Sequence, residues 1–138
     1  MTVVKADEFT GGFLSYEITG VASTTAAAQG SIANPFGASV NILRAYVVPS
    51  VESTGSANLG IGITTAAAKS TSILNDDDMN GVTIGKAIMC FTITAAEAAV
   101  APAIWESDKF LTFSASATLV GFVGTLYLEV LPTTVANA

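Results

Sequence analysis

Histidine is absent from this 138-residue chain, and cysteine occurs once, as Cys90. The lack of histidine removes the side chain that most often serves as a general base and as a metal ligand. A single cysteine excludes both an intramolecular disulfide and a cysteine-based metal cluster. Its apolar neighbours, Met89 and Phe91, favour a buried thiol. The chain also lacks a G-x-S-x-G motif and a G-K-S or G-K-T motif, so we expect neither an enzyme nor a bound cofactor.

Charged residues are scarce as well. They make up 12% of the chain, whereas hydrophobic residues make up 51%, and typical soluble domains carry about 25% charge. The formal net charge is −6, and the five basic residues are scattered as Lys5, Arg44, Lys69, Lys86 and Lys109. No basic stripe is present to neutralise phosphates, so we expect no nucleic-acid partner. Surfaces with so little charge indicate contact with other protein subunits.

The length predicts one domain. Residues 1–12 are polar and end at a Gly-Gly pair, so we interpret them as an extended N-terminal arm that precedes a single domain of residues 13–138. Charges in the first eight residues do not fit a signal peptide. The segment from Phe110 to Leu128 is uncharged and long enough for a membrane helix. Its Ser and Thr content and its period of two favour a pair of strands instead, so we expect no membrane partner.

Alternation with a period of two is clearest at the end of the chain. The runs Phe110–Ala117 and Phe122–Val130 each place one set of side chains on a core and the other on a solvated or partner-covered face. Residues 13–18 and 40–48 also predict strands, the second ended by Pro49 and Ser50. Residues 59–63 predict a strand whose second face is only glycine, which indicates that another backbone or a bulky aromatic ring packs against it.

The remaining segments give weaker signals. They predict an extended segment at 21–32, a helical turn at 66–70, a polar loop at 75–81, strands at 82–84 and 86–94, and a helical stretch without an apolar stripe at 95–103. The total is about eight short strands with closely spaced turns. This pattern is typical of an all-β fold, a jelly-roll-like antiparallel β-sandwich.

Three acidic residues, Asp76, Asp77 and Asp78, form the one cluster that suggests a metal site. Calcium requires several converging oxygen ligands. Consecutive aspartates point in different directions unless the loop curls around an ion, and the spacing does not match an EF-hand. We therefore expect no metal site, with calcium as the weak alternative, and interpret the run as a solvated or partner-facing loop.

Two further residues have more than one interpretation. Trp105 precedes the acidic turn Glu106–Asp108, so it forms either a platform for a sugar or a buried end of the sandwich beside two solvated acids. Arg44 lies in the middle of a predicted strand, so its charge is either on the outer face or engaged across a subunit contact, where Arg is enriched.

Several segments between Val40 and Leu131 resemble the small head decoration (cement) proteins of tailed bacteriophages. They are the strand Val40–Val48, the Gly-alternating Gly60–Ile63, the acidic segment Asn75–Gly81, the motif Ile104-Trp105-Glu106-Ser107-Asp108, and the final GFVGTLYLEVL from Gly121 to Leu131. The resemblance implies a jelly-roll-like sandwich that assembles as a homotrimer. Such trimers sit on the capsid exterior and clamp neighbouring major capsid subunits, after synthesis in the cytoplasm of the bacterial host.

The expected partners are therefore a second and third copy of this chain and a major capsid protein. A ligand that binds only the expanded shell stabilises it by mass action, and three-fold avidity multiplies weak contacts. The candidate interface residues are Phe9, Phe13, Arg44, Tyr46, Trp105 and Tyr127.

Two alternatives to the decoration hypothesis remain. One is a phage fibre, spike or carbohydrate-binding module of similar architecture, in which Trp105 would support sugar binding. The other is a capsid-forming jelly-roll subunit, which would assemble into shells without another protein.

Overall fold

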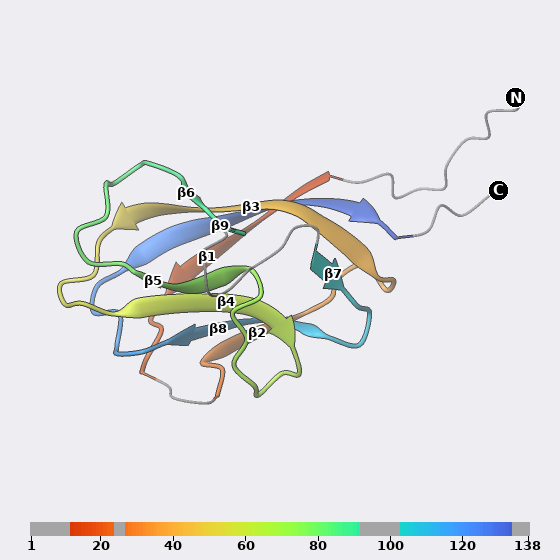
Figure 1. Cartoon of the computed structure of the whole chain (residues 1–138), viewed down its shortest axis with the longest axis horizontal. Helices are drawn as coiled ribbons and strands as arrows, with labels where there is room; N and C mark the ends of the chain where they lie inside the picture. The colour runs from red at the N-terminus through yellow and green to blue at the C-terminus, as the bar shows by residue number, and fades with distance from the viewer. Residues whose placement is uncertain (1–11, 24–26, 92–102, 134–138) are drawn as a thin grey trace, which may run out of the picture.

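The computed structural model describes residues 12–23, 27–91 and 103–133, which form two β-sheets packed face to face (Figure 1). The strands in these ranges are β1 Gly12–Thr19, β2 Gly30–Ala33, β3 Val40–Val51, β4 Asn58–Thr64, β5 Leu74–Asp78, β6 Ile88–Met89, β7 Ala103–Trp105, β8 Phe110–Ala115 and β9 Val123–Pro132. Every pairing between them is antiparallel. In the part of the chain described here, no helix is long and apolar enough to cross a membrane. The prediction of an all-β sandwich is confirmed.

The order of the strands in the two sheets identifies the architecture of the sandwich. The first sheet has the order β1-β9-β3-β6, with β7 also paired to β3, and the second has the order β2-β8-β4-β5. Strands at matching positions in the two orders are neighbours along the chain: β1 with β2, β9 with β8, β3 with β4, and β6 with β5. The chain therefore passes from one sheet to the other at these connections, which is the winding of a jelly roll.

The core lies between the sheets and follows the predicted alternation. On β9, the side chains of Leu126, Leu128 and Val130 are buried, whereas Tyr127 is exposed. The second sheet contributes a matching apolar layer from β4 and β8, made of Leu59, Ile61, Leu111, Phe113 and Ala115. Burial of such side chains is the main favourable term in folding, at about 25 cal/mol per Å² of apolar surface.

The outer face of the second sheet is covered over β4 and β8 by the protein itself. Residues 65–72 lie over it, and a Cβ placed on Gly62 would come within 2.6 Å of the Ser70 carbonyl carbon. The hydroxyl of Ser72 accepts a hydrogen bond from the amide of Ile63 at 3.0 Å. Thr112, on the same outer face, is 1% exposed. The prediction that a backbone packs on the glycine face is confirmed, and we call this surface the covered face.

Several sequence-predicted elements differ in the structure. Residues 74–78 form strand β5 rather than part of a polar loop, because the edge of a sheet tolerates polar side chains. Residues 82–84 are not a strand, and only 88–89 of the expected strand 86–94 is, with 92–94 outside the described ranges. Residues 66–70 contain a turn, closed by the Ala68 amide on the Thr65 carbonyl at 3.1 Å, rather than a helix.

Three other boundaries also shift. Of the segment 21–32, only residues from Gly30 onward are strand, and residues 24–26 lie outside the described ranges. Pro49 does not end its strand, because β3 continues to Val51 through an irregularity at Pro49, a position where a sheet accepts proline. The expected helical stretch 95–103 lies outside the described residues except for Ala103, which begins β7. The proposed arm also falls outside them up to residue 11.

Candidate interaction surface

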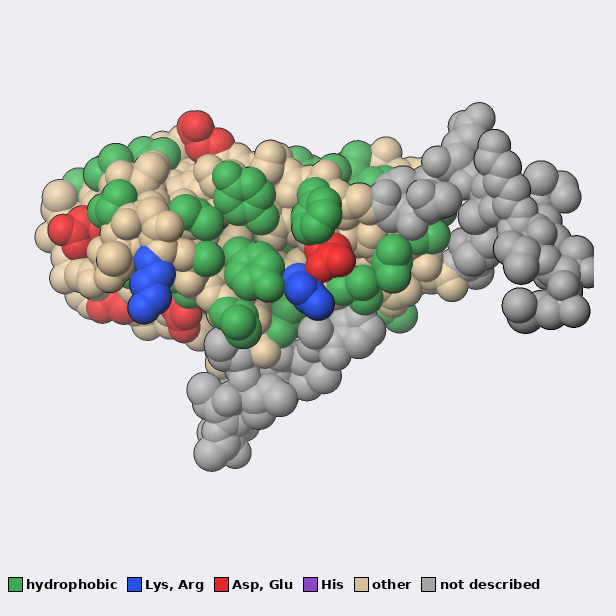
Figure 2. Space-filling view, turned by 90° about the horizontal axis from the view of Figure 1, so that it is seen from above, with side chains coloured by type: hydrophobic (Ala, Val, Ile, Leu, Met, Phe, Trp, Pro, Cys, Tyr) green, Lys and Arg blue, Asp and Glu red, His purple; other side chains and the backbone are tan. Residues whose placement is uncertain are grey.

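The outer face of the first sheet is apolar and exposed. Eight large hydrophobic residues are exposed within the described ranges, and five of them lie on this face: Phe13 (78%), Met89 (62%), Ile104 (54%), Tyr127 (43%) and Leu131 (41%). Figure 2 looks onto this face and shows apolar side chains gathered around one acidic and one basic residue. We call it the bare face. Apolar patches of this kind mark sites of contact with other proteins.

The strand register explains how these residues come together. Directly opposite residues in an antiparallel sheet share a face. One row across the sheet joins Ser15 to Tyr127, Tyr127 to Tyr46, and Tyr46 to Met89. Four strands thus bring one aromatic pair and a methionine side by side, although they are far apart in the sequence.

A second row carries one acidic and one basic residue at the centre of the bare face. Phe13 is opposite Glu129, and Glu129 is opposite Arg44. The Nε atom of Arg44 lies 3.4 Å from Oε2 of Glu129, with the two side chains 69% and 31% exposed. Such an exposed pair adds less than about 1 kcal/mol to stability. Its effect here is to neutralise the centre of the apolar surface.

A groove borders the bare face between β3 and the segment around β6. It has a volume of about 370 Å³ and is lined by Leu43, Arg44, Ala45, Tyr46, Met89, Cys90 and Phe91. Apolar walls with a cationic group at one side can receive an apolar side chain that is followed by a carboxylate. The bare face is therefore not flat but offers a place for an anchoring residue.

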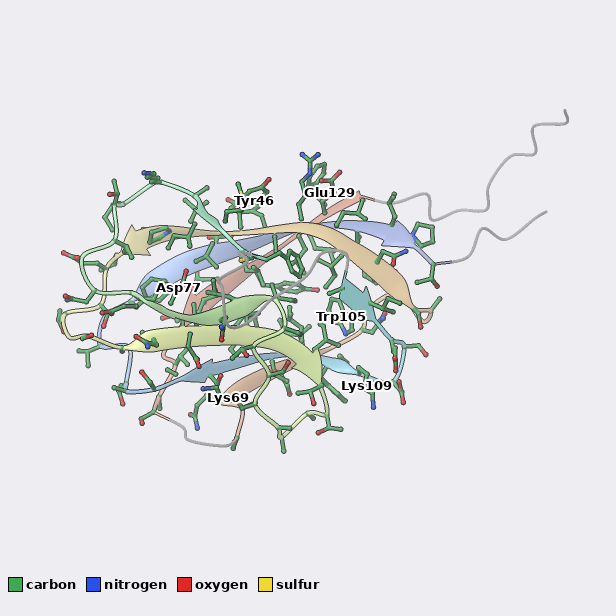
Figure 3. The ribbon with its side chains drawn as sticks, in the orientation of Figure 1. Tyr46, Lys69, Asp77, Trp105, Lys109 and Glu129 are labelled. Carbon is green, nitrogen blue, oxygen red and sulfur yellow. The ribbon has the colours of Figure 1, made fainter. Side chains whose placement is uncertain are left out.

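Four of the six predicted interface residues lie together on the bare face. They are Phe13, Arg44, Tyr46 and Tyr127. Figure 3 shows Tyr46 and Glu129 pointing away from the sandwich on the outer side of the first sheet. Arg44 lies on the outer face, with its side chain 69% exposed. Phe9 lies outside the described residues.

Trp105 is not an interface residue, and that prediction is wrong. Its side chain is 0% exposed. Its indole Nε1 donates a hydrogen bond to the Lys109 carbonyl at 3.0 Å, and its ring packs edge-to-face on Phe36 with centroids 6.3 Å apart. Burial of a large aromatic ring with its N–H satisfied is a packing role. The ring is also unable to form a platform for a sugar.

The sequence reasoning missed Met89, Ile104 and Leu131. Leu131 continues the outward series of Tyr127 and Glu129 and could have been found by extending the alternation of β9 to its end. Ile104 is opposite Asn41 and faces outward, whereas its neighbour Trp105 faces the core. Met89 is opposite Tyr46 on a strand of two residues, which gives no alternation to detect.

The acidic run does not gather into a metal site. Lys69 Nζ lies 3.1 Å from Oδ1 and 3.2 Å from Oδ2 of Asp76, and it donates a hydrogen bond to Oδ2. Asp78 accepts hydrogen bonds from the Ser56 hydroxyl at 2.6 Å and from the Asn80 amide at 3.0 Å. No three His, Cys, Asp or Glu side chains come together as metal ligands in the residues that the structure describes.

The third carboxylate of the run faces the other way. Asp77 is opposite Leu59 in the ladder, and Figure 3 shows it between the layers. Burial, followed by the charge of Asp76, raises its pKa. Burial and the charge of Asp77 raise the pKa of the Cys90 thiol to about 12, so this buried thiol is neutral and unreactive at physiological pH. The prediction of a buried cysteine is confirmed.

Comparisons with known proteins give one informative result. No protein-family model matches this chain, and no curated protein matches it. Among solved structures, it is similar to a chain from the capsid of Ralstonia phage GP4, with a TM-score of 0.54 and 14% sequence identity. The match covers 97% of this chain and 92% of that chain. The two chains share the jelly-roll-like fold over nearly their whole length.

Proposed function

We propose that this chain is a structural protein of a tailed-phage virion, a decoration (cement) protein that binds the capsid exterior as a homotrimer. The bare face is the observation that carries the proposal. A surface with five exposed large hydrophobic residues and one neutralised charge pair costs solubility unless a partner covers it. The shared fold with a chain from a phage capsid supports the structural virion role.

The charge of the chain supports an exterior position. Its formal net charge is −6, with only five basic residues. An acidic protein is repelled by packaged DNA, which carries about one negative charge per 1.7 Å of helix axis. Contact with the outer surface of the shell avoids this repulsion.

The proposed trimer needs a contact surface separate from the bare face. Three exposed hydrophobic residues lie near one end of the sandwich: Val51 (48%), Ile84 (51%) and Val120 (53%). The Val120 carbonyl accepts a hydrogen bond from the Thr54 amide at 3.0 Å, and the Gly85 amide bonds the Pro49 carbonyl at 2.8 Å, which holds the three loops together. We assign the contact between copies to this end, leaving the bare face for the shell.

The two alternatives separate by experiment. The carbohydrate-binding hypothesis has lost the residue that motivated it, since Trp105 is buried. The capsid-forming hypothesis predicts that the purified chain alone assembles into shells. Light scattering over a concentration series distinguishes these states: a decoration protein gives a stable mass near three times 14.0 kDa, without larger particles.

The direct test is binding to expanded, undecorated shells of the phage that carries the gene. The purified chain should co-sediment with these shells, and the variant Tyr127→Lys should lose that binding at least tenfold because it places a charge in the centre of the bare face. The matched control is Ala67→Lys, which places the same charge on exposed residue 67 of the covered face. Equal loss from both variants, or no binding by the unmodified chain, would contradict the proposal.

A further inference from the structure

One sheet edge differs from all the others. β1 is an end strand of the first sheet and pairs on one side only, with β9, among the strands described. It has eight residues, of which five are exposed, and its register with β9 runs from Gly12 to Thr19 without a shift. A long, regular edge presents a row of unpaired backbone amides and carbonyls that can accept another strand.

The other edges are protected by the usual devices. On the far side of the first sheet, β6 has two residues and β7 has three. In the second sheet, β2 has four residues, and β5 carries three aspartates and a register shift. Asp76 in β5 has a φ of 52°, which breaks the regular spacing of that edge. β1 has no proline, no lysine and no bulge, and no other described strand pairs with its free edge.

A groove accompanies the open edge. It lies between the end of β1 and the neighbouring β2, with a volume of about 220 Å³, and its lining includes the apolar side chains of Ile18, Val21, Ile32 and Phe113. Glu17 also lines it. Strand addition uses both features: backbone hydrogen bonds along the edge supply affinity, and pockets for alternate side chains supply specificity.

We propose that β1 accepts an extended segment of the shell protein as an additional strand of the first sheet. This inference rests on the proposed function and names its mode of contact. The segment would carry apolar side chains at alternate positions, and one of these side chains would enter the groove. It would also carry a basic residue close to Glu17, which complements the acidic surface of this chain. The added strand would extend the bare face, because Phe13 of β1 belongs to both.

A second copy of this chain is the less suitable occupant. β1 against β1 would form an isologous contact, which closes a two-fold pair and not a ring of three. The remaining described edges are too short or too irregular to complement an eight-residue strand. The shell protein therefore remains the occupant consistent with a trimer.

Hydrogen exchange followed by mass spectrometry tests the proposal on the unmodified chain, free and bound to expanded shells. Alternate amides of an edge strand point outward. About half of the amides in the peptide covering β1 should therefore exchange at least tenfold more slowly on the shell. The peptide covering β5, which does not line the groove, serves as an internal control and should keep its rate. Binding without slower exchange in β1 overturns this inference and leaves the proposed function standing, whereas absence of binding overturns both.

Two variants identify the occupant. Gly30→Trp fills the groove, because residue 30 is exposed, lines the groove and shares a face with Phe113. It should weaken binding to shells at least tenfold, while Ser107→Trp, in the exposed β7–β8 turn, should not. Deletion of residues 1–11 should leave the slower exchange of β1 in place. If the deletion abolishes it, the occupant is the arm of a neighbouring copy and the proposal fails.

Discussion

The outer faces of the two sheets differ in what lies over them. On the second sheet, Thr71 packs against Gly60 and Ser70 against Gly62, and the side chains of Thr112 and Ser114 are buried. On the first sheet, Tyr127 and four other large apolar side chains are exposed. A sandwich folds by burying its inner faces, so either outer face was available for a second layer. The protein has supplied that layer from its own chain on one side, whereas the large apolar side chains on the other side are exposed in the described residues.

Each face also carries one ion pair, and the pairs differ in surroundings. Lys69 and Asp76 on the covered face are 23% and 35% exposed, whereas Arg44 and Glu129 on the bare face are 69% and 31% exposed. Oδ1 of Asp76 is fully shielded from solvent and has Lys69 as its charged neighbour. The first pair therefore holds the covering segment in place, and the second keeps the centre of the bare face neutral.

The largest expected effect on stability comes from adding a methyl group beneath residues 65–72, the segment that covers the second sheet. Gly62→Ala should reduce the free energy of unfolding by about 1–3 kcal/mol, because its Cβ collides with the backbone of Ser70 and one of the two must move. Urea denaturation measures the change. The control is Gly12→Ala on the first sheet, where a Cβ meets nothing within 4 Å, and a shift within about 0.5 kcal/mol is expected. Equal losses at both sites would show that residues 65–72 do not seal the face.

The two ion pairs provide the next comparison. Lys69→Met should cost about 1–2 kcal/mol of unfolding free energy, since it leaves a partly buried carboxylate without its cation. Adding Asp76→Asn should restore part of the loss, because asparagine keeps the left-handed backbone at this position. Arg44→Met should cost less than about 1 kcal/mol. A larger loss of unfolding free energy from Arg44→Met than from Lys69→Met would contradict this interpretation, in which the Lys69–Asp76 pair stabilises the covering segment and the Arg44–Glu129 pair adds little to stability.

A smaller effect depends on pH. The pKa of Asp77 is raised in the folded protein, so the folded state binds that proton more tightly and loses stability as pH rises through the raised pKa. Asp77→Asn should therefore stabilise the protein at pH 7, by less than about 1 kcal/mol. The gain should vanish below about pH 3.8, the ordinary pKa of aspartate.

Asp78 serves as a control, because its pKa is shifted in the opposite direction to that of Asp77. Hydrogen bonds from Ser56 and from the Asn80 amide lower its pKa, so its contribution is present above the ordinary pKa and is lost on acidification. Thermal unfolding at pH 7 should thus shift upward for Asp77→Asn and downward for Asp78→Asn. Shifts in the same direction would contradict the inward placement of Asp77.

The smallest expected effect is on the bare face itself. Tyr127→Ser should change the free energy of unfolding by less than about 0.5 kcal/mol, because the side chain is 43% exposed and packs on a surface rather than in the core. Chemical denaturation together with shell binding separates the two roles. If Tyr127→Ser lowered the free energy of unfolding without weakening binding to shells, Tyr127 would contribute to folding and not to the proposed contact.

Much of the architecture could be predicted from alternation alone. The inward series Leu126, Leu128 and Val130 and the glycine face at Gly60 and Gly62 both behave as the sequence indicates. β5 could not be recognised, because an edge strand with a bulge loses the alternation on which the prediction depends. Strands of two or three residues, such as β6, are too short to show any period.

The interaction surface was predictable only in part, for a reason visible at β7. Ile104 and Trp105 are adjacent, yet one faces outward and the other enters the core. Composition favours the aromatic residue as the contact, but a shift of one position along a strand exchanges the two faces. Phe13, Tyr46 and Tyr127 belong to longer strands, where the neighbours settle the face. These residues come side by side only because of the order of the strands in the sheet, and the hydrophobic pattern of the sequence does not determine that order.

The position of β9 in the first sheet has a consequence for synthesis. This strand lies between β1 and β3, and it is the last strand of the chain in the described residues. During translation, β1 and β3 leave the ribosome without the strand that joins them, and the first sheet forms only when residues 123–132 arrive. A chain stopped before β9 would expose β1 without its partner and one unpaired edge of β3, which makes truncated products prone to aggregation. The first sheet is thereby completed only once β9 has been made, and only molecules that contain β9 present the finished bare face.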